Sequence, residues 1–349
     1  ELDVEDVLKK EMIQDESEMF VMQLLGNMVV HSYAGRPRLC PVIPSRMVRL
    51  TLTHGRFRES AVAFASFGAV VSRSPEGITQ GYGLGKIALS LVKRPDTKGH
   101  LSRVYAAVYG LINCFVEPLQ ACEESHKYAY EAGLCTGDVE FANANALLVG
   151  CAGTQSGSDL QSLANQLSLY NGKMKEMNTK TFLTPTQVYE CFARNLVGGT
   201  DDPTELIYGG NDLLSDMLET QNKNALSHYY FARMILAYIF GRYELATEMA
   251  DQCRKAAPMM RNQRLVNEIF YLALIALASA DEEAKSESRD SAAVALKELE
   301  GWLGTSQWNF LHKVKLLKAE IAFHDGNVDD TATLYDDAIR IAGEHRFVH

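Results

Sequence analysis

A glycine turn between two apolar-periodic segments is the feature that most constrains how this chain folds. The sequence predicts a helix on each side of Gly241-Arg242-Tyr243, with a stop at Pro258. The register of a tetratricopeptide-type unit, about 34 residues long, places Ala246 where the second helix must approach the first closely. Met234 stands where that unit usually has a small residue, so the match is imperfect.

The same pattern occurs twice more. Near the end of the chain, Gly326-Asn327-Val328 supplies the turn, and Ala319 and Ala338 supply small residues on either side. A weaker copy has its turn at Gly55-Arg56-Phe57. One helix pair cannot cover its own apolar face, so neighbouring pairs must stack to bury a continuous core. We therefore expect an all-α fold, an α-solenoid of stacked antiparallel helix pairs of tetratricopeptide-like type.

Most prolines and several glycines separate the remaining apolar-periodic segments, and β-branched alternation is nearly absent. We expect no sheet of three or more strands. The predicted helices cover residues 3–33, 43–54, 58–72, 76–93, 99–115, 118–133, 138–153, 158–177, 185–197, 204–219, 223–240, 243–256, 262–280, 288–303, 307–324 and 328–342.

Two polar stretches divide this helical series. Residues 198–203, Gly-Gly-Thr-Asp-Asp-Pro, indicate a boundary between an N-terminal helical array over 1–198 and a C-terminal tetratricopeptide-like array over 204–349. One continuous solenoid is the alternative. The acidic segment 281–290 is predicted to be a loop between helices.

Composition restricts the class of partner. Apolar residues make up 47% of the 349 positions, enough for a sizeable core, and the net charge is −10. Nucleic acid and anionic membranes both need basic patches, so we expect neither as a partner. The longest apolar run, 269–278, is about half of a bilayer span. No signal peptide opens the chain, which begins at Glu1 and therefore resembles a piece of a longer protein.

The cysteines favour a cytoplasmic setting. They are odd in number, scattered, and never spaced as C-x-x-C, so buried reduced thiols are favoured over a disulfide framework or a zinc site. The seven are Cys40, Cys114, Cys122, Cys135, Cys151, Cys191 and Cys253.

The run Gly81-Tyr82-Gly83-Leu84-Gly85-Lys86 superficially resembles a phosphate-binding loop. A P-loop needs a glycine five residues before the Gly-Lys pair and a Ser or Thr after it. Gln80 and Ile87 occupy those positions, and no hydrophobic strand precedes the run. We expect these glycines to let two helices pack closely, and we expect no ATP binding.

Two other clusters also have a structural explanation. Thr136 or Asp138 can cap the following helix, with Glu140 favoured by the positive end of its dipole, so the acidic pair does not require an acid–base role. His345 and His349 have helical metal-pair spacing but no accompanying H-E-x-x-H motif. The sequence predicts no catalytic, cofactor-binding or metal-ligating residue, no cofactor, and no enzymatic activity for this segment.

Tyrosines at helical spacing form the remaining candidate surface. We expect them to line the core or a groove, and some of them to anchor a peptide. They are Tyr105, Tyr109, Tyr128, Tyr130, Tyr229, Tyr230 and Tyr238.

Three stretches resemble one particular family. Residues 43–55 (IPSRMVRLTLTHG) with 59–64 (ESAVAF), residues 81–89 (GYGLGKIAL) and residues 137–142 (GDVEFA) resemble the tetratricopeptide-like helical region of large multidomain signalling ATPases. In that family an AAA/STAND-type ATPase, often preceded by a serine/threonine-kinase-like domain, comes before this region. GAF, histidine-kinase or other output domains often follow it.

The resemblance is best over residues 15–180, and the family's nucleotide-binding motifs lie outside this segment. It implies a non-catalytic protein-interaction and regulatory module of a signal-transduction ATPase. The partner would be a protein, a peptide, or the parent's own ATPase or output domains. The alternative is a helical sensor domain that encloses a small ligand or peptide. A pocket lined by convergent polar groups would favour the sensor, and an open surface with exposed aromatics would favour the interaction module.

Overall fold

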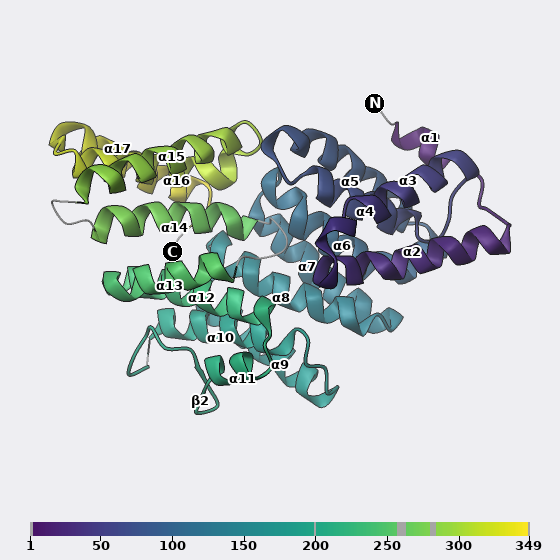
Figure 1. The fold of residues 1–349 in the computed structure, drawn as a ribbon, viewed down its shortest axis with the longest axis horizontal. Helices are drawn as coiled ribbons and strands as arrows, with labels where there is room; N and C mark the ends of the chain where they lie inside the picture. Colours follow the sequence, from purple (N-terminus) through teal and green to yellow (C-terminus); the bar gives the residue numbers. More distant parts are fainter. Residues whose placement is uncertain (1–2, 199, 257–262, 280–283, 348–349) are drawn as a thin grey trace. The chain divides into compact units, whose positions relative to one another are not determined.

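The computed structural model describes residues 3–198, 200–256, 263–279 and 284–347, and these residues form an all-α helical-repeat fold, as predicted (Figure 1). The α-helices of the described residues are α1 (Val4–Leu8), α2 (Glu16–Gly35), α3 (Val42–His54), α4 (Ser60–Val71), α5 (Ile78–Val92), α6 (Leu101–Leu111), α7 (Leu119–Thr136), α8 (Val139–Ser156), α9 (Leu160–Glu176), α10 (Leu183–Val197), α11 (Leu213–Glu219), α12 (Lys223–Ile239), α13 (Tyr243–Lys255), α14 (Gln263–Ser279), α15 (Lys285–Leu303), α16 (Gln307–His324) and α17 (Val328–Glu344). Short 3-10 turns lie at η1 (Pro37–Leu39), η2 (Pro75–Gly77), η3 (Pro95–His100) and η4 (Asn113–Phe115).

Contacts along the chain group the residues into two compact units. Unit 1 contains Glu1–Glu117, Glu124–Leu148 and Met259–Gln263, and unit 2 contains Pro118–Glu123, Val149–Pro258 and Arg264–His349. The boundary predicted at 198–203 would separate two continuous halves of the sequence, whereas each of these compact units is made of separate stretches of the chain.

Unit 1 has its core among the helices from α3 to α6. Helix α4 is apolar around most of its circumference, and its residues Ala61–Ala65 are all buried. A helix that is apolar all round must be covered on several sides, and α3, α5 and α6 all pack against it. Met47 and Phe64 are fully buried in this core.

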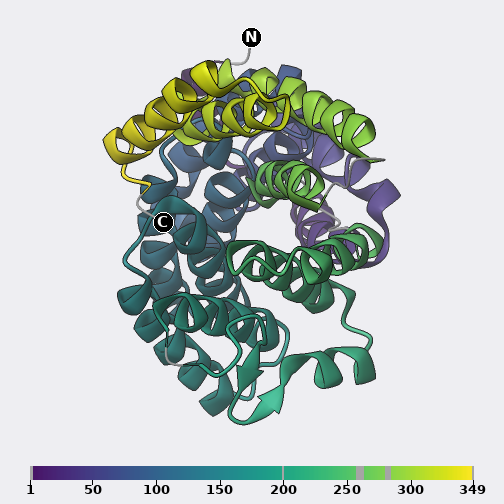
Figure 2. The same ribbon diagram turned by 90° about the vertical axis from the view of Figure 1, so that its left-hand side faces the viewer.

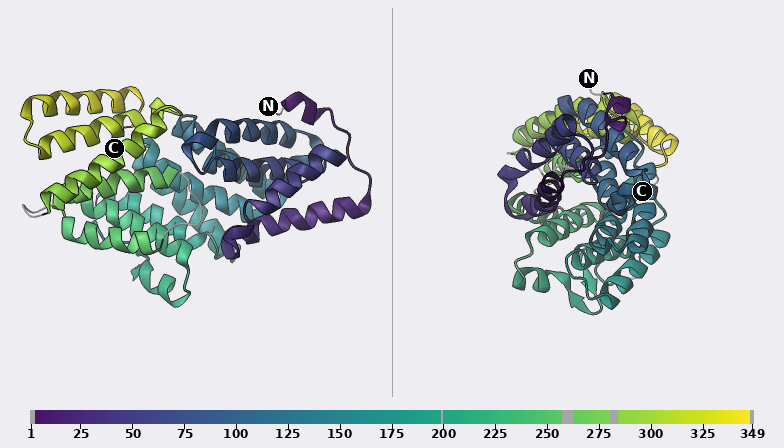
Figure 3. Two further views of the ribbon diagram at one scale, coloured as in Figure 1. Left: turned by 45° about the horizontal axis from the view of Figure 1, so that its top comes forward. Right: turned by 90° about the vertical axis from the view of Figure 1, so that its right-hand side faces the viewer.

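Unit 2 contains the two better repeat copies, and both have the predicted turn. Gly241 between α12 and α13 has φ +70°, and Gly326 between α16 and α17 has φ +79°, backbone angles that favour glycine. The predicted small residues Ala246 and Ala319 are completely buried. Helices α16 and α17, yellow-green to yellow in Figure 3, run side by side in opposite directions. Pro258 lies outside the described residues.

The first predicted helix, 3–33, is wrong because the structure has two helices there, α1 and α2. Between them the chain is extended, and the Ile13 N–H donates to the Arg56 carbonyl at 2.9 Å. The Asp15 carboxylate then caps α2 by accepting the Glu18 N–H at 3.0 Å. A new helix therefore begins at a residue that the apolar pattern had placed in a helix interior.

The helix predicted over 204–219 is also partly wrong. Strands β1 (Ile207–Tyr208) and β2 (Asn211–Asp212) form an antiparallel hairpin before α11 begins (Figure 2). Gly209 and Gly210 both have positive φ, which is the requirement of a two-residue hairpin turn of type I′. The Asp212 carboxylate then accepts the Leu214 N–H and starts α11.

The predicted acidic loop over 281–290 is corrected as well. Residues 281–283 lie outside the described residues, and α15 begins at Lys285. The Arg289 guanidinium reaches from this first part of α15 to the carboxylate of Asp325, with Nη2 and Oδ2 3.2 Å apart. The polar composition of this stretch reflects an exposed helix face.

Candidate functional site

The glycine run of residues 81–86 lies inside α5, so its backbone amides belong to a helix and form no phosphate-binding loop. A Cβ at Gly81 would overlap Ser72 Oγ and lie 2.8 Å from the Gly68 carbonyl O of α4, so the predicted close helix packing is confirmed there. Gly83 faces open space. The Lys86 Nζ lies 4.3 Å from the centre of the Tyr82 ring.

The acidic residues near 138 belong to a helix start, as predicted. The Asp138 carboxylate accepts the Phe141 N–H at the beginning of α8, whereas Thr136 bonds back into α7 through its hydroxyl and the Ala132 carbonyl. Burial raises the pKa of Asp138, and the nearby positive charge of Arg103 opposes that shift. Of the two predicted capping residues, Asp138 is therefore the one that caps α8.

His345 has an aromatic partner within unit 2. Its ring stacks on Trp308 with the ring centres 4.5 Å apart, and its Nδ1 lies 3.0 Å from the Trp308 carbonyl O. This contact fixes the end of α17 against the start of α16. His349 lies outside the described residues.

The tyrosines of unit 1 form an aromatic cluster on α6 and α7. The Tyr105 ring lies 5.1 Å from that of Tyr109 and 5.6 Å from that of Tyr128, centre to centre. Tyr128 is 57% exposed, whereas Tyr130 is buried. Burial raises the pKa of Tyr105 to about 12, so its hydroxyl stays protonated at neutral pH. These residues include both core and surface positions, as expected.

A second aromatic cluster in unit 2 gathers tyrosines from four helices. The Tyr238 ring of α12 lies 5.9 Å from that of Tyr243 in α13 and 5.8 Å from that of Tyr271 in α14. The hydroxyl of Tyr335 in α17 donates to Glu320 of α16 at 2.8 Å, and both residues also act on the pKa of Tyr238, which burial raises. We call Tyr238, Tyr243, Tyr271 and Tyr335 the tyrosine cluster.

The rim of the tyrosine cluster is exposed at the turn between α12 and α13. Ile239 is 48% exposed, Phe240 is 42% exposed and Tyr243 is 40% exposed. Three large apolar side chains thus meet solvent within five positions. Such a group adjoining ordered aromatic rings has the composition of protein-binding hot spots.

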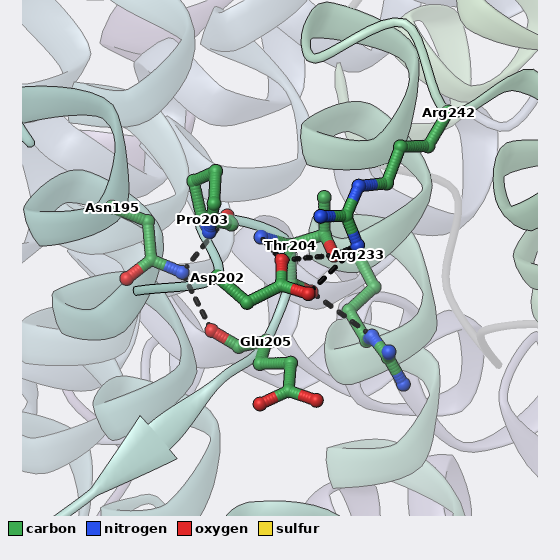
Figure 4. Close-up of polar contacts among 7 residues, drawn as sticks. All are labelled: Asn195, Asp202, Pro203, Thr204, Glu205, Arg233 and Arg242. Carbon is green, nitrogen blue, oxygen red and sulfur yellow. Dashed lines mark hydrogen bonds and ion pairs between the residues drawn. The ribbon is translucent and has the colours of Figure 1, made fainter. Parts of the chain in front are cut away.

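A polar clamp holds the chain beside that turn (Figure 4). The Asp202 carboxylate accepts the Thr204 N–H at 2.8 Å, the Thr204 hydroxyl at 2.7 Å and an Arg242 guanidinium N–H at 2.7 Å. From α10, the Asn195 amide donates to the carbonyls of Pro203 and Glu205. Loop 202–205 is therefore fixed to α10 and to the residue that precedes α13.

The clamp continues through Arg233 of α12. The Arg233 Nε donates to the Thr204 carbonyl at 3.0 Å, and its Nη1 lies 3.2 Å from the Tyr229 hydroxyl (Figure 4 shows Arg233 and Thr204). That hydroxyl donates to Asp212 at 3.2 Å. Two arginines thus tie the loop and the β-hairpin region to the helix pair that carries the exposed rim.

Unit 2 also holds a buried polar cluster. The Tyr189 hydroxyl lies 2.8 Å from His228 Nδ1, and the neighbouring Arg264 guanidinium donates to Ser227 Oγ and lies 3.8 Å from the Glu268 carboxylate. Arg264 is only 2% exposed. Burial, with a contribution from the Arg264 charge, lowers the pKa of His228 well below its ordinary range, so the imidazole is neutral.

Sequence reasoning missed the clamp and the buried polar cluster. Asp202 carried a signal, because Asp followed two residues later by Thr is typical of local side-chain capping. Glu268 lies four residues after Arg264 on the same helix, a spacing visible in the sequence, whereas Ser227 becomes a neighbour of Arg264 only when α12 and α14 pack together.

The seven cysteines all lie in described residues and all carry thiols, with Cys135 exposed and the other six buried. Within the described ranges, no group of three or more His, Cys, Asp or Glu side chains is placed to hold a metal ion. Over the same part of the chain, no helix has the combined length and apolarity that crossing a bilayer requires.

Comparisons with known proteins assign this chain to no family. No protein-family model and no curated protein matches this sequence. Among solved structures, the chain is similar to a circular tandem repeat protein with a novel repeat topology and enhanced subunit contact surfaces. That match covers 94% of this chain and 97% of the other at 11% identity, with a TM-score of 0.27. A similarity of this size carries no argument about fold or function.

Proposed function

We propose that this chain is a non-catalytic protein-interaction module, and that the exposed rim of the tyrosine cluster binds a peptide or a protein segment. The observation that carries the proposal is the rim itself, Ile239, Phe240 and Tyr243, next to rings that four helices hold in place. Aromatic anchors on a rigid support lose little conformational entropy on binding.

The polar clamp supports this assignment because it limits motion at the rim. Arg242 directly precedes Tyr243 and is bound to Asp202. Arg233, on α12, donates to the Thr204 carbonyl of the same loop. A turn fixed from both sides presents its apolar side chains in one arrangement. Preorganisation of this kind increases affinity without adding contacts.

The wider role rests on the family resemblance in the N-terminal part. We propose that the parent protein is a multidomain signal-transduction ATPase of the AAA/STAND type, in which this module couples the ATPase to a partner or to an output domain. Reading the coding sequence on both sides of residues 1 and 349 tests this. A P-loop upstream supports the proposal, and an upstream sequence without one contradicts it.

The buried polar cluster favours a second candidate, a helical sensor domain for a small ligand or peptide. Arg264, Glu268 and His228 converge in the interior of unit 2, and convergent polar groups are typical of ligand sites. In this alternative the effector binds inside unit 2, so changes on the exposed rim have no effect on it.

A peptide-display experiment separates the two candidates. The purified chain is used to select binders from a random peptide library, and the affinity of enriched peptides is measured by fluorescence anisotropy. We expect Phe240→Ala with Tyr243→Ala to weaken binding by about 10- to 100-fold, since two anchors are lost. The control Leu169→Ala with Val294→Ala removes two apolar side chains of unit 2 that are more exposed than the rim residues, and it should leave affinity unchanged.

Three results would contradict the interaction module. The first is a failure to enrich any peptide, and the second is equal weakening by both double variants. The third is binding that is insensitive to the rim but abolished by Arg264→Ala, which would favour the sensor. Circular dichroism of each variant verifies that it is folded.

A further inference from the structure

Helix α2 of unit 1 presents an apolar stripe to solvent along its outer face. Phe20 is 62% exposed, Leu24 is 46% exposed, Met28 is 44% exposed and Val21 is 40% exposed. Phe20, Leu24 and Met28 follow the spacing i, i+4, i+8, and Val21, Leu24 and Met28 follow i, i+3, i+7. Both spacings place side chains on one face of a helix. We call these four residues the α2 stripe.

The opposite face of α2 is already used. Met22 and Val29 are buried in the core of unit 1, and a Cβ at Gly26 would lie 3.3 Å from the side chain of Glu59, the residue that precedes α4. An ordinary surface helix has one apolar face and one polar face. Because α2 has a second apolar face, its sequence is that of a helix covered on both sides.

The charges at the two ends of α2 point to what covers it. Asp15 and Glu16 are exposed at its N-terminal end, and Arg36 and Arg38 are exposed just beyond its C-terminal end. The Glu18 carboxylate already has a partner within the chain, because its Oε1 lies 2.6 Å from His54 Nδ1, so only Asp15 and Glu16 are counted as available acidic charges at this end. The helix is therefore acidic at one end and basic at the other, with an apolar stripe between.

We propose that the α2 stripe is the interface of a homodimer, in which α2 of one chain packs antiparallel against α2 of a second copy. A two-fold axis near Leu24 sets Phe20 of each chain opposite Met28 of the other. It also brings Glu16 within about one helical turn of Arg36 on the second copy. The same surface then serves both chains, as an isologous interface requires.

The antiparallel direction is favoured for two physical reasons. Opposite charges meet at both ends only when the helices run in opposite directions, and a parallel pair would place like charges together. The helix dipoles also oppose one another in that arrangement, which is favourable. The α2 stripe lies in unit 1, so a dimer formed through it does not depend on the rim of the tyrosine cluster in unit 2.

Sedimentation velocity of the full chain over a hundredfold concentration range tests the dimer. We expect the wild type to reach twice the 38.7 kDa chain mass. Leu24→Glu should raise the dimer Kd by on the order of 100-fold, because it places two like charges at the axis. The matched control is Gln23→Glu, an adjacent exposed position of α2 off the stripe with the same change in charge, and it should remain dimeric.

Charge reversal tests the direction of the pair. Glu16→Arg and Arg36→Glu should each raise the Kd about two- to fivefold, as exposed ion pairs do, and the double variant should restore it. A wild type that stays at the monomer mass at every concentration overturns the proposal. Equal effects of Leu24→Glu and Gln23→Glu overturn it as well, and additive loss in the double charge variant excludes the antiparallel arrangement.

Discussion

Two helix pairs, α4–α5 in unit 1 and α12–α13 in unit 2, reach the same antiparallel arrangement by different packing. In α4–α5 the contact is between backbones, with Gly81 against Gly68 and Ser72. In α12–α13 the glycine lies in the turn, and the contact is made by small side chains, Ala246 and Ala250, on one face of α13. The first pair therefore depends on having no side chain at a particular position, and the second depends on having a small one.

The two pairs also differ in how much of each helix is covered. Nine of the twelve residues of α4 are buried, whereas only four of the thirteen in α13 are. A helix buried on most sides cannot move away from an added atom without disturbing several neighbours, because protein cores are close-packed. We therefore expect unit 1 to respond more strongly than unit 2 to the addition of the same number of atoms.

The largest effect is expected at Gly81. Gly81→Ala should lower the free energy of unfolding by about 3 kcal/mol, because the new methyl group meets the Gly68 backbone as well as the Ser72 hydroxyl. Gly83→Ala lies in the same helix with open space around it and should instead stabilise by about 0.5–1 kcal/mol. Urea unfolding of both variants measures the difference. Equal effects would show that the backbone contact between α4 and α5 is not close.

A somewhat smaller loss is expected at Ala246. Ala246→Leu adds atoms to a completely buried position and should cost about 2 kcal/mol as overpacking. Hydrogen exchange should locate the lost protection in α12, α13 and neighbouring helices of unit 2, with residues 40–117 of unit 1 unaffected. A harmless Ala246→Leu, or protection lost equally in both units, would mean that the repeat register is wrong.

The free energy of unfolding should fall in mild acid because unit 1 contains a buried neutral histidine, His126. Burial lowers the pKa of His126 to about 4, and its Nδ1 lies 2.8 Å from the amide oxygen of Asn145. As pH falls below the ordinary pKa of about 6.5, the unfolded chain binds a proton that the folded chain does not, so stability falls until about pH 4. Between about pH 7.5 and 5 the wild type should lose about 1–2 kcal/mol more than His126→Gln, which keeps a donor but does not titrate.

Urea unfolding of both proteins at the two pH values measures this difference, in which the other titrating groups cancel. His228 of unit 2, bonded to Tyr189 and also held neutral by burial, should behave in the same way in a His228→Gln variant. Identical pH dependence of the wild type and His126→Gln would mean that His126 is accessible to solvent protons in the folded state.

The smallest effect is expected for the exposed ion pair of α15. Arg289 and Asp325 are both on the surface, where solvent and salt screen their attraction. Arg289→Ala should leave the urea midpoint unchanged within error. A clear loss would indicate that α15 depends on this contact for its position.

Sequence periodicity predicted the fold class and most helix bounds because an apolar face at helical spacing is a local property of the chain. The α12–α13 and α16–α17 pairs were predicted within two residues because the turn glycines mark the ends of their helices. The break at residues 9–15 and the β1–β2 hairpin were missed. One depends on Arg56, more than forty positions away, and the other on a two-residue turn inside an apolar-periodic stretch.

The candidate sites could be predicted less completely. Tyr238 was named from its spacing, but its association with Tyr271 and Tyr335 needs helices that are far apart in sequence. The same is true of Arg264 with Ser227. A residue's chemistry can be read from one position, whereas the convergence of several side chains depends on how α12, α14 and α17 pack together.

The contact at Gly81 also determines which natural variation this chain can tolerate. A single-nucleotide change can convert a glycine codon to alanine, serine, valine or another larger residue, and at position 81 each of these adds a Cβ beside the Gly68 backbone. At position 83 the same changes meet open space. Across species, position 81 should therefore stay glycine unless residue 68 or 72 changes with it, while position 83 should drift freely between small and polar residues.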